Sequence, residues 1–139
     1  SGRTIGNLVL EFVRAHPRAR FVANLGSQAY FSLMRCAAAM VGNSSSGIIE
    51  AASFELPVVN IGTRQKGRAR ARNVIDVGYE ASAITRGLAQ ALSPEVRASL
   101  TGLENPYGDG HASERIVLVL REITLGDALM VKRFCDLPW

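Results

Sequence analysis

The sequence predicts an α/β domain in which helices cover a parallel β-sheet on both faces. Short runs rich in β-branched residues alternate with helical patterns of about ten residues, and several of the runs end at glycine. The composition, with 47% hydrophobic and 20% charged residues, is that of an ordinary globular protein. Alternation of this kind is typical of βαβ units, whose right-handed crossovers place helices on both sides of the sheet.

The spacing of apolar residues assigns the individual elements. The first helix carries Ile5, Leu8 and Phe12 on one face and stops at Pro17, and a Ser-Pro pair caps a later one at Ser93. We expect helices at residues 4–17, 27–38, 45–55, 81–92, 93–100 and 111–123, and strands at residues 20–26, 38–42, 56–62 and 72–78. This order predicts one Rossmann-like, three-layer domain over residues 1–139 with a sizeable core. A doubly wound half normally begins with a strand, so we expect the chain to belong to a longer protein.

Composition and patterning exclude several classes of protein. No apolar run approaches the roughly 20 residues of a membrane span, and the first residues lack the pattern of a signal peptide. The two cysteines, Cys36 and Cys135, are too few for a disulfide scaffold or a metal site, and we expect reduced thiols in a cytoplasmic protein. No membrane, metal or cofactor is predicted.

Three serines lie between two glycines where the second predicted strand passes into a helix. Ser44, Ser45, Ser46 and Gly47 offer several hydroxyl and backbone donors at this junction, where unpaired helical N–H groups attract anions. Isoleucines follow where a P-loop needs lysine and serine or threonine, so a nucleotide triphosphatase is not indicated. The frame is also one residue too long for the nucleophile elbow of a serine hydrolase. The serines therefore either hold an anion or merely cap the helix.

Glu50 lies one turn beyond the serines, on the same helical face as Ser46. A carboxylate in this place can accept hydrogen bonds from both hydroxyls of a ribose, as an acidic residue does in dinucleotide folds. The alternative is a solvated glutamate that the helix dipole favours. Phosphate donors followed by an acid suggest a nucleoside diphosphate.

A basic segment, residues 62–72, follows the next predicted strand and so emerges at the same edge of the sheet. Its five cations are spaced two apart, and in an extended segment they would share one face: Arg64, Lys66, Arg68, Arg70 and Arg72. We expect one or two of them to reach an anion, with the others solvated. A nucleic-acid-binding module is the competing hypothesis. The modest net charge of +4 and the lack of interleaved aromatic residues disfavour it.

Three motifs together resemble the carboxyl-terminal half of the UDP-N-acetylglucosamine 2-epimerases, in their hydrolysing branch. They are "MVGNSSSGIIEAASFELPVVNIGTRQKGRARARNVIDVG", "HPRARFVANLGSQAYFSLM" and "NPYGDGHASERI". The resemblance runs from about residue 16 to 123. It departs from the family at Glu55, where glycine is common, a change that affects a helix end rather than the site.

The resemblance implies one half of a glycosyltransferase-B-like enzyme of two Rossmann-like domains. UDP would be held by the diphosphate-binding Ser44 and Ser45, by Glu50 on the ribose and by Arg64 directed at the cleft, with Tyr30 near the uracil. The implied reaction eliminates UDP across C1 and C2 of UDP-N-acetylglucosamine and hydrates the resulting glycal to N-acetylmannosamine, in sialic or related nonulosonic acid synthesis.

The same resemblance places the catalytic carboxylates in an amino-terminal domain, so no catalytic residue is assigned here and this domain alone is expected to be inactive. We expect Asp109 to lie in a turn at a helix start. The partners expected are the UDP-sugar, that amino-terminal domain and a second copy of the full-length protein, without nucleic acid. A 2,4-diacetamido-trideoxyhexose in place of N-acetylglucosamine remains an alternative sugar.

Overall fold

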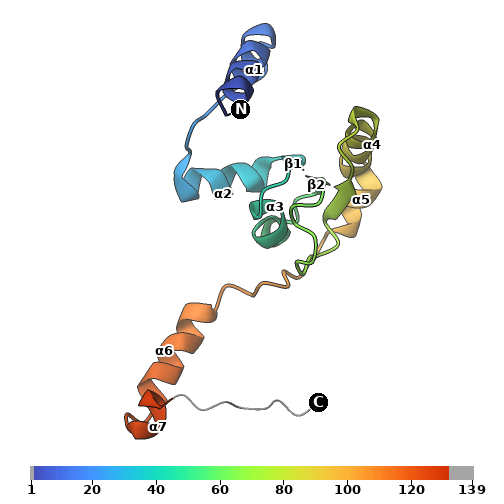
Figure 1. Cartoon of the computed structure of the whole chain (residues 1–139). Helices are drawn as coiled ribbons and strands as arrows, with labels where there is room; N and C mark the ends of the chain where they lie inside the picture. Colours follow the sequence, from blue (N-terminus) through green and yellow to red (C-terminus); the bar gives the residue numbers. More distant parts are fainter. Residues whose placement is uncertain (1, 132–139) are drawn as a thin grey trace.

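The computed structural model describes residues 2–131, and Figure 1 shows the chain with most of its elements labelled. In chain order these are α1 (Gly2–Ala15), α2 (Gly26–Cys36), β1 (Met40–Gly42), α3 (Ser46–Ile49), the 3₁₀ helix η1 (Ala51–Phe54), β2 (Val58–Ile61), β3 (Val74–Val77), α4 (Ala81–Ala91), α5 (Pro94–Ser99), α6 (Ala112–Glu122) and α7 (Asp127–Met130). Among these helices none is long and apolar enough to cross a membrane. Cys36 is exposed at the end of α2, whereas Cys135 lies outside the described residues.

The sheet has the order β1-β2-β3, and all of its strands are parallel. Successive side chains of a strand point to opposite faces, so Val58 and Val59 of β2 mark the two faces of the sheet. Gly47 of α3 lies against Val58, and Gly87 of α4 lies against Val59. Helices therefore cover both faces, which confirms the predicted α/β, Rossmann-like, three-layer arrangement. The serine loop and the basic segment both follow the carboxyl ends of strands, as predicted.

Two predicted elements have a different form in the structure. Residues 20–26 were expected to form a strand, but they are irregular, and Phe21 and Val22 are more than half exposed. A strand is stable only with a hydrogen-bonded neighbour, and no described strand pairs with this segment. The predicted helix over 45–55 splits into α3 and η1. It ends at Glu55, which takes a left-handed conformation with φ 51°, a conformation that glycine adopts most easily.

A local signal predicted the start of α5. The Ser93 hydroxyl accepts a hydrogen bond from the Val96 N–H at 3.3 Å, with Pro94 in the first turn, so the predicted cap of α5 is confirmed. The short α7 near the end of the described chain was not predicted.

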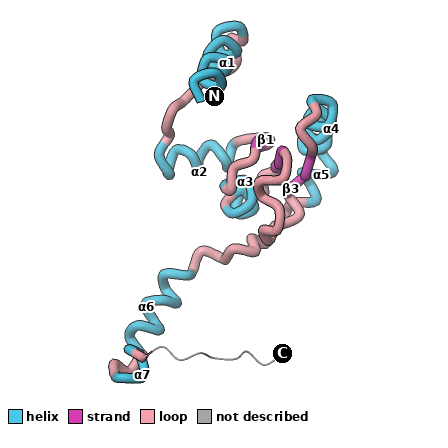
Figure 2. The backbone as a smooth tube through the Cα atoms, viewed as in Figure 1, coloured by secondary structure: helices cyan, strands magenta, loops and turns pink. Residues whose placement is uncertain are grey.

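The core is smaller than the chain length predicted. Its buried cluster joins Met34 of α2, Ala51 of η1 and Val58 of β2. The whole chain exposes 11167 Å², whereas a compact protein of this mass exposes about 7,000 Å². The difference arises at the ends, because α1 and α6 bury no residue and loops join them to the sheet region (Figures 1 and 2). Within residues 2–131, nothing covers their amphipathic faces.

Gly87 provides a test of the packing between α4 and the sheet. A Cβ atom at this position would lie 2.8 Å from Val77 Cγ1 and 3.1 Å from Val59 Cγ1. We expect Gly87→Ala to lower the melting temperature by about 4 °C, because overpacking of roughly 1–3 kcal/mol outweighs the gain of about 0.5–1 kcal/mol in helix propensity. The control is Gly6→Ala in α1, where a Cβ meets no described atom within 4 Å. Calorimetric melting of Gly87→Ala at or above the parent temperature would contradict the close packing.

Candidate functional site

The serine loop turns the chain sharply from β1 into α3. The Ser44 hydroxyl accepts a hydrogen bond from the Ser46 N–H at 3.3 Å, and the Ser44 carbonyl accepts one from the Gly47 N–H at 3.2 Å. Gly47 is buried, and a Cβ there would lie 2.8 Å from Val58 Cγ1. Glycine is therefore needed for close packing of α3 on β2, a role that is independent of any ligand.

The three hydroxyls of the loop have different environments. Ser46 Oγ lies 2.8 Å from the Tyr30 hydroxyl, so α2 supports the loop from one side. Ser45 occupies the cap position of α3, yet its side chain makes no capping hydrogen bond. Simple helix capping thus does not account for Ser45, which leaves its hydroxyl able to serve a ligand.

The basic segment folds back on the serine loop. Arg64 Nη1 and Gln65 Nε2 donate to the Asn43 carbonyl oxygen at 3.1 and 2.8 Å. This places the exposed Arg64 guanidinium at the carboxyl ends of β1 and β2, beside the serine loop. A cation in that place is suited to an anion held by the serines.

The remaining cations do not share one face, contrary to the prediction for an extended segment. The segment is a series of turns in which Arg70 pairs with Asp76 of β3. Arg72 Nε instead donates to the Ser99 carbonyl at 2.9 Å. The turns let Arg70 reach Asp76 on β3 and Arg72 reach the Ser99 carbonyl at the end of α5.

Glu50 follows α3 and is partly buried. Its Oε2 atom is shielded from solvent and has no hydrogen-bond partner among the described residues. The residue lines a cavity of about 490 Å³ whose wall includes Phe31, Phe54 and Tyr107. A buried carboxylate oxygen without a donor is costly, so this atom is suited to accept from a polar ligand.

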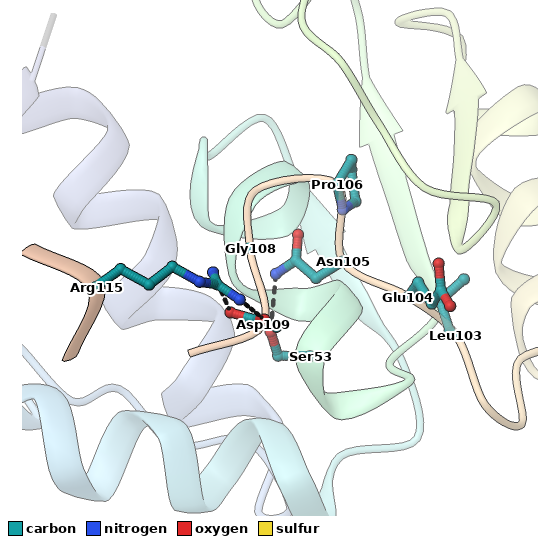
Figure 3. A pocket seen from close by; sticks show the side chains of 8 residues that line it. All are labelled: Ser53, Leu103, Glu104, Asn105, Pro106, Gly108, Asp109 and Arg115. Atoms are coloured by element: carbon teal, nitrogen blue, oxygen red, sulfur yellow. Dashed lines mark hydrogen bonds and ion pairs between the residues drawn. The ribbon is translucent and has the colours of Figure 1, made fainter. Parts of the chain in front are cut away.

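Residues 105–110, the N-P-Y-G-D-G motif, form the far wall of that cavity. Asn105 Nδ2 donates to Ser53 Oγ at 2.7 Å and to the Ile49 carbonyl at 2.8 Å, so it attaches this segment to the helix that carries Glu50. Figure 3 shows a neighbouring cavity of about 590 Å³, in which Asn105 reaches Ser53 and the Arg115 guanidinium reaches Asp109.

Asp109 behaves as a structural residue. The Arg115 guanidinium donates to it at 3.0 Å, and together with the His111 N–H it holds the pKa of the Asp109 carboxyl below its ordinary value. The group is therefore ionised at neutral pH and held by a cation, which suits a turn at the start of α6 and not a proton donor.

Sequence reasoning missed two residues that build the site. Gln65 is only 2% exposed and joins the basic segment to the serine loop, although it lies inside the motif that was singled out. Asn105 contacts Ile49, which is 56 residues away in sequence, and only its place in a recognised motif indicated a role. Neither contact has a local signature, because both partners are main-chain carbonyls.

Comparison with known proteins gives the family. The family model for UDP-N-acetylglucosamine 2-epimerase matches residues 2–121. A UDP-N,N'-diacetylbacillosamine 2-epimerase (hydrolyzing) of Legionella pneumophila is 42% identical over 94% of this chain and 33% of its own length. A GDP/UDP-N,N'-diacetylbacillosamine 2-epimerase (hydrolyzing) of Campylobacter jejuni is 42% identical over 86% of the chain and 31% of its own length. A UDP-N-acetylglucosamine 2-epimerase of Neisseria meningitidis is 30% identical over 93% of the chain and 34% of its own length.

The chain thus spans about a third of the length of these relatives. The match covers the serine loop, the basic segment and the N-P-Y-G-D-G motif. The chain belongs to the UDP-N-acetylglucosamine 2-epimerase family.

Proposed function

We propose that this chain is the UDP-binding, carboxyl-terminal part of a hydrolysing UDP-sugar 2-epimerase. The observation that carries the proposal is the meeting of the serine loop with Arg64 through the Asn43 carbonyl, at the carboxyl ends of two parallel strands. Ligands of open α/β sheets bind at this edge. The residues that we assign to UDP are Ser44, Ser45, Ser46, Gly47, Glu50, Arg64 and Tyr30.

Each assigned group has a chemical role in this proposal. Hydroxyl and backbone donors of the serine loop bind the diphosphate, and Arg64 balances its charge. The unpaired Glu50 Oε2 accepts from the ribose hydroxyls. Tyr30, which Ser46 holds in place, flanks the uracil.

The reaction that we propose breaks the bond between C1 and the diphosphate oxygen as a base removes the C2 proton, and water then adds to the glycal. The departing UDP gains negative charge, which the serine loop and Arg64 stabilise. The base that takes the proton belongs, in this proposal, to the amino-terminal domain of the enzyme.

Two sugars fit the reaction, N-acetylglucosamine and a 2,4-diacetamido-trideoxyhexose. The relatives at 42% identity are named for diacetylbacillosamine, whereas the relative named for N-acetylglucosamine is 30% identical. This difference favours the diacetamido sugar as the substrate of the complete enzyme.

The exposed apolar faces of α1 and α6 point to a partner domain. The uncovered apolar residues of α1 and α6, among them Leu8 at 60% and Leu120 at 67% exposure, support a covering domain in the complete enzyme. We assign that cover to the amino-terminal domain. We further place the enzyme in the cytoplasm, as a homo-oligomer, in sialic or related nonulosonic acid synthesis.

Comparison of UDP with 2′-deoxy-UDP tests the role of Glu50. If the carboxylate accepts from both ribose hydroxyls, UDP should bind about tenfold more tightly than the deoxy analogue, which corresponds to about 1.4 kcal/mol. Glu50→Gln should weaken UDP and bring that ratio close to one. The matched variant Ser45→Ala should weaken both nucleotides alike, because Ser45 contacts only phosphate. Isothermal titration calorimetry measures the six affinities, of UDP and 2′-deoxy-UDP for the parent and both variants.

The melting temperature of each ligand-free variant is the control, since glutamate near a helix start also adds a few tenths of a kcal/mol to stability. A folded Glu50→Gln protein that keeps the parental ratio of UDP to 2′-deoxy-UDP affinity would show that Glu50 does not bind the ribose.

A further inference from the structure

A chain of hydrogen bonds runs from β2 through β3 and the basic segment to Asn43, the residue before the serines. Asn60 Nδ2 donates to Asp76 Oδ1 at 2.7 Å, and Asp76 Oδ2 pairs with Arg70 Nη1. Arg70 Nη2 donates to the Gln65 carbonyl at 2.7 Å, and Gln65 Nε2 donates to the Asn43 carbonyl at 2.8 Å. The chain therefore ends at the residue whose carbonyl also receives Arg64.

Two members of this chain, Asn60 and Gln65, are buried at 2% exposure each. The Arg70 and Asp76 side chains that link them are 25% and 56% exposed, and Asn43 is exposed. Hydrogen bonds between buried groups hold their partners in defined positions, because leaving a buried polar group unpaired is costly. Arg70 is the link that joins the sheet to the turn carrying Arg64.

The charge of Arg70 is already used inside the protein. Its guanidinium pairs with Asp76 on one side and the Gln65 carbonyl on the other, whereas Arg64 is exposed and donates to a carbonyl only. Arg64 is consequently available to balance a diphosphate, whereas Arg70 supports its position.

We propose that Arg70, held by Asp76, is a positioning residue that fixes the turn of Arg64 and Gln65 against the serine loop, so that Arg64 is placed in advance for the diphosphate. This inference rests on the proposed UDP site. Placement in advance matters because ordering a mobile arginine side chain on binding costs conformational entropy, which lowers the affinity for the ligand.

A double-mutant cycle on this chain tests the inference, with UDP affinity measured by calorimetry. Arg70→Met keeps much of the apolar stem and removes both hydrogen bonds. We expect it to weaken UDP about fivefold in the parent and less than about 1.5-fold in an Arg64→Ala background, because Arg70 acts through Arg64. Arg72→Met is the matched control: it removes an arginine of the same segment that binds the carbonyls of Ser99 and Thr101 instead. It should leave UDP affinity unchanged.

The melting temperature of every variant separates positioning from folding. Should Arg70→Met fail to fold, Arg70→Lys keeps the ion pair with Asp76 and loses the bond to Gln65, and the same coupling to Arg64→Ala is measured with it. Equal losses from the Arg70 variant in both backgrounds would overturn the inference, as would an unchanged affinity for UDP in the folded variant.

Failure of the UDP site itself gives a different pattern. A parent chain that binds no UDP, or binds it equally well after Ser45→Ala and Arg64→Ala, would overturn the proposed function and this inference together. Loss of UDP binding in Ser45→Ala and Arg64→Ala with no effect of Arg70→Met would overturn only the inference.

Discussion

Mixed with UDP-N-acetylglucosamine or its 2,4-diacetamido relative, the pure chain is expected to release no UDP above the uncatalysed background. Removal of the weakly acidic C2 proton needs a positioned base, and general base catalysis alone contributes about 10²–10⁴ in rate. Within residues 2–131 the carboxylates near the site are already committed: Asp109 pairs with Arg115, and Asp76 pairs with Arg70. In our proposal Glu50 is occupied by the ribose. Chromatography of UDP and NMR of the free sugar measure turnover.

The complete Legionella relative is the positive control for this assay, since the chain spans about a third of its length. UDP binding by the same preparation of the chain must be measured in parallel, so that a misfolded sample is not mistaken for an inactive one. Suppose that the pure, intact 139-residue chain alone forms N-acetylmannosamine or its diacetamido equivalent. This result would contradict the proposal that the base belongs to another domain.

The loss of binding affinity with added salt should differ by orders of magnitude between a UDP site and a nucleic-acid-binding groove. A groove that contacts six or more phosphates loses about three decades of affinity between 50 and 200 mM salt, whereas one diphosphate displaces few counterions. Arg70 and Arg72 are bound to Asp76 and to main-chain carbonyls, so the basic segment offers fewer cations than its sequence suggests. We expect weak UDP binding with a shallow slope and no tight RNA complex.

Fluorescence anisotropy with a labelled single-stranded RNA and calorimetry with UDP, each at the two salt concentrations, measure the difference. Arg68→Ala is a useful companion variant because it removes an exposed cation of the segment and should barely change UDP affinity. Nanomolar RNA binding with a steep salt slope would favour the nucleic-acid-binding module over the UDP site.

Local chemistry made much of the fold predictable. The cap of α5 is local, because Ser93 accepts its hydrogen bond from Val96, three residues later. The apolar runs at 56–62 and 72–78 contain strands that pair with each other in the sheet. The sequence also predicted that the serine loop and Arg64 lie at the same edge of the sheet, because the carboxyl ends of parallel strands meet there. Glu55 at a left-handed helix end was likewise predictable from the family pattern.

The assignment of residues to the UDP site stays a prediction. The conformation of the basic segment beside them could be predicted from the sequence only in part. The pattern of alternating charges in residues 62–72 predicted a common face, because sequence spacing alone cannot tell an extended segment from a series of turns. The turns form since Arg70 and Arg72 find acceptors on β3 and after α5, which are distant in sequence.

By itself the sequence determined the α/β class, the helices that end at local signals, the family, and the edge of the sheet where the serine loop and the basic segment lie. Those properties depend on periodicity and on contacts within a few residues. Only the tertiary structure decided that residues 20–26 form no strand, that Arg70 pairs with Asp76 and that Glu50 faces a cavity without a partner. Each of these depends on which distant group supplies a hydrogen bond or fails to, and hydrogen bonds between distant residues leave no periodic trace in the sequence.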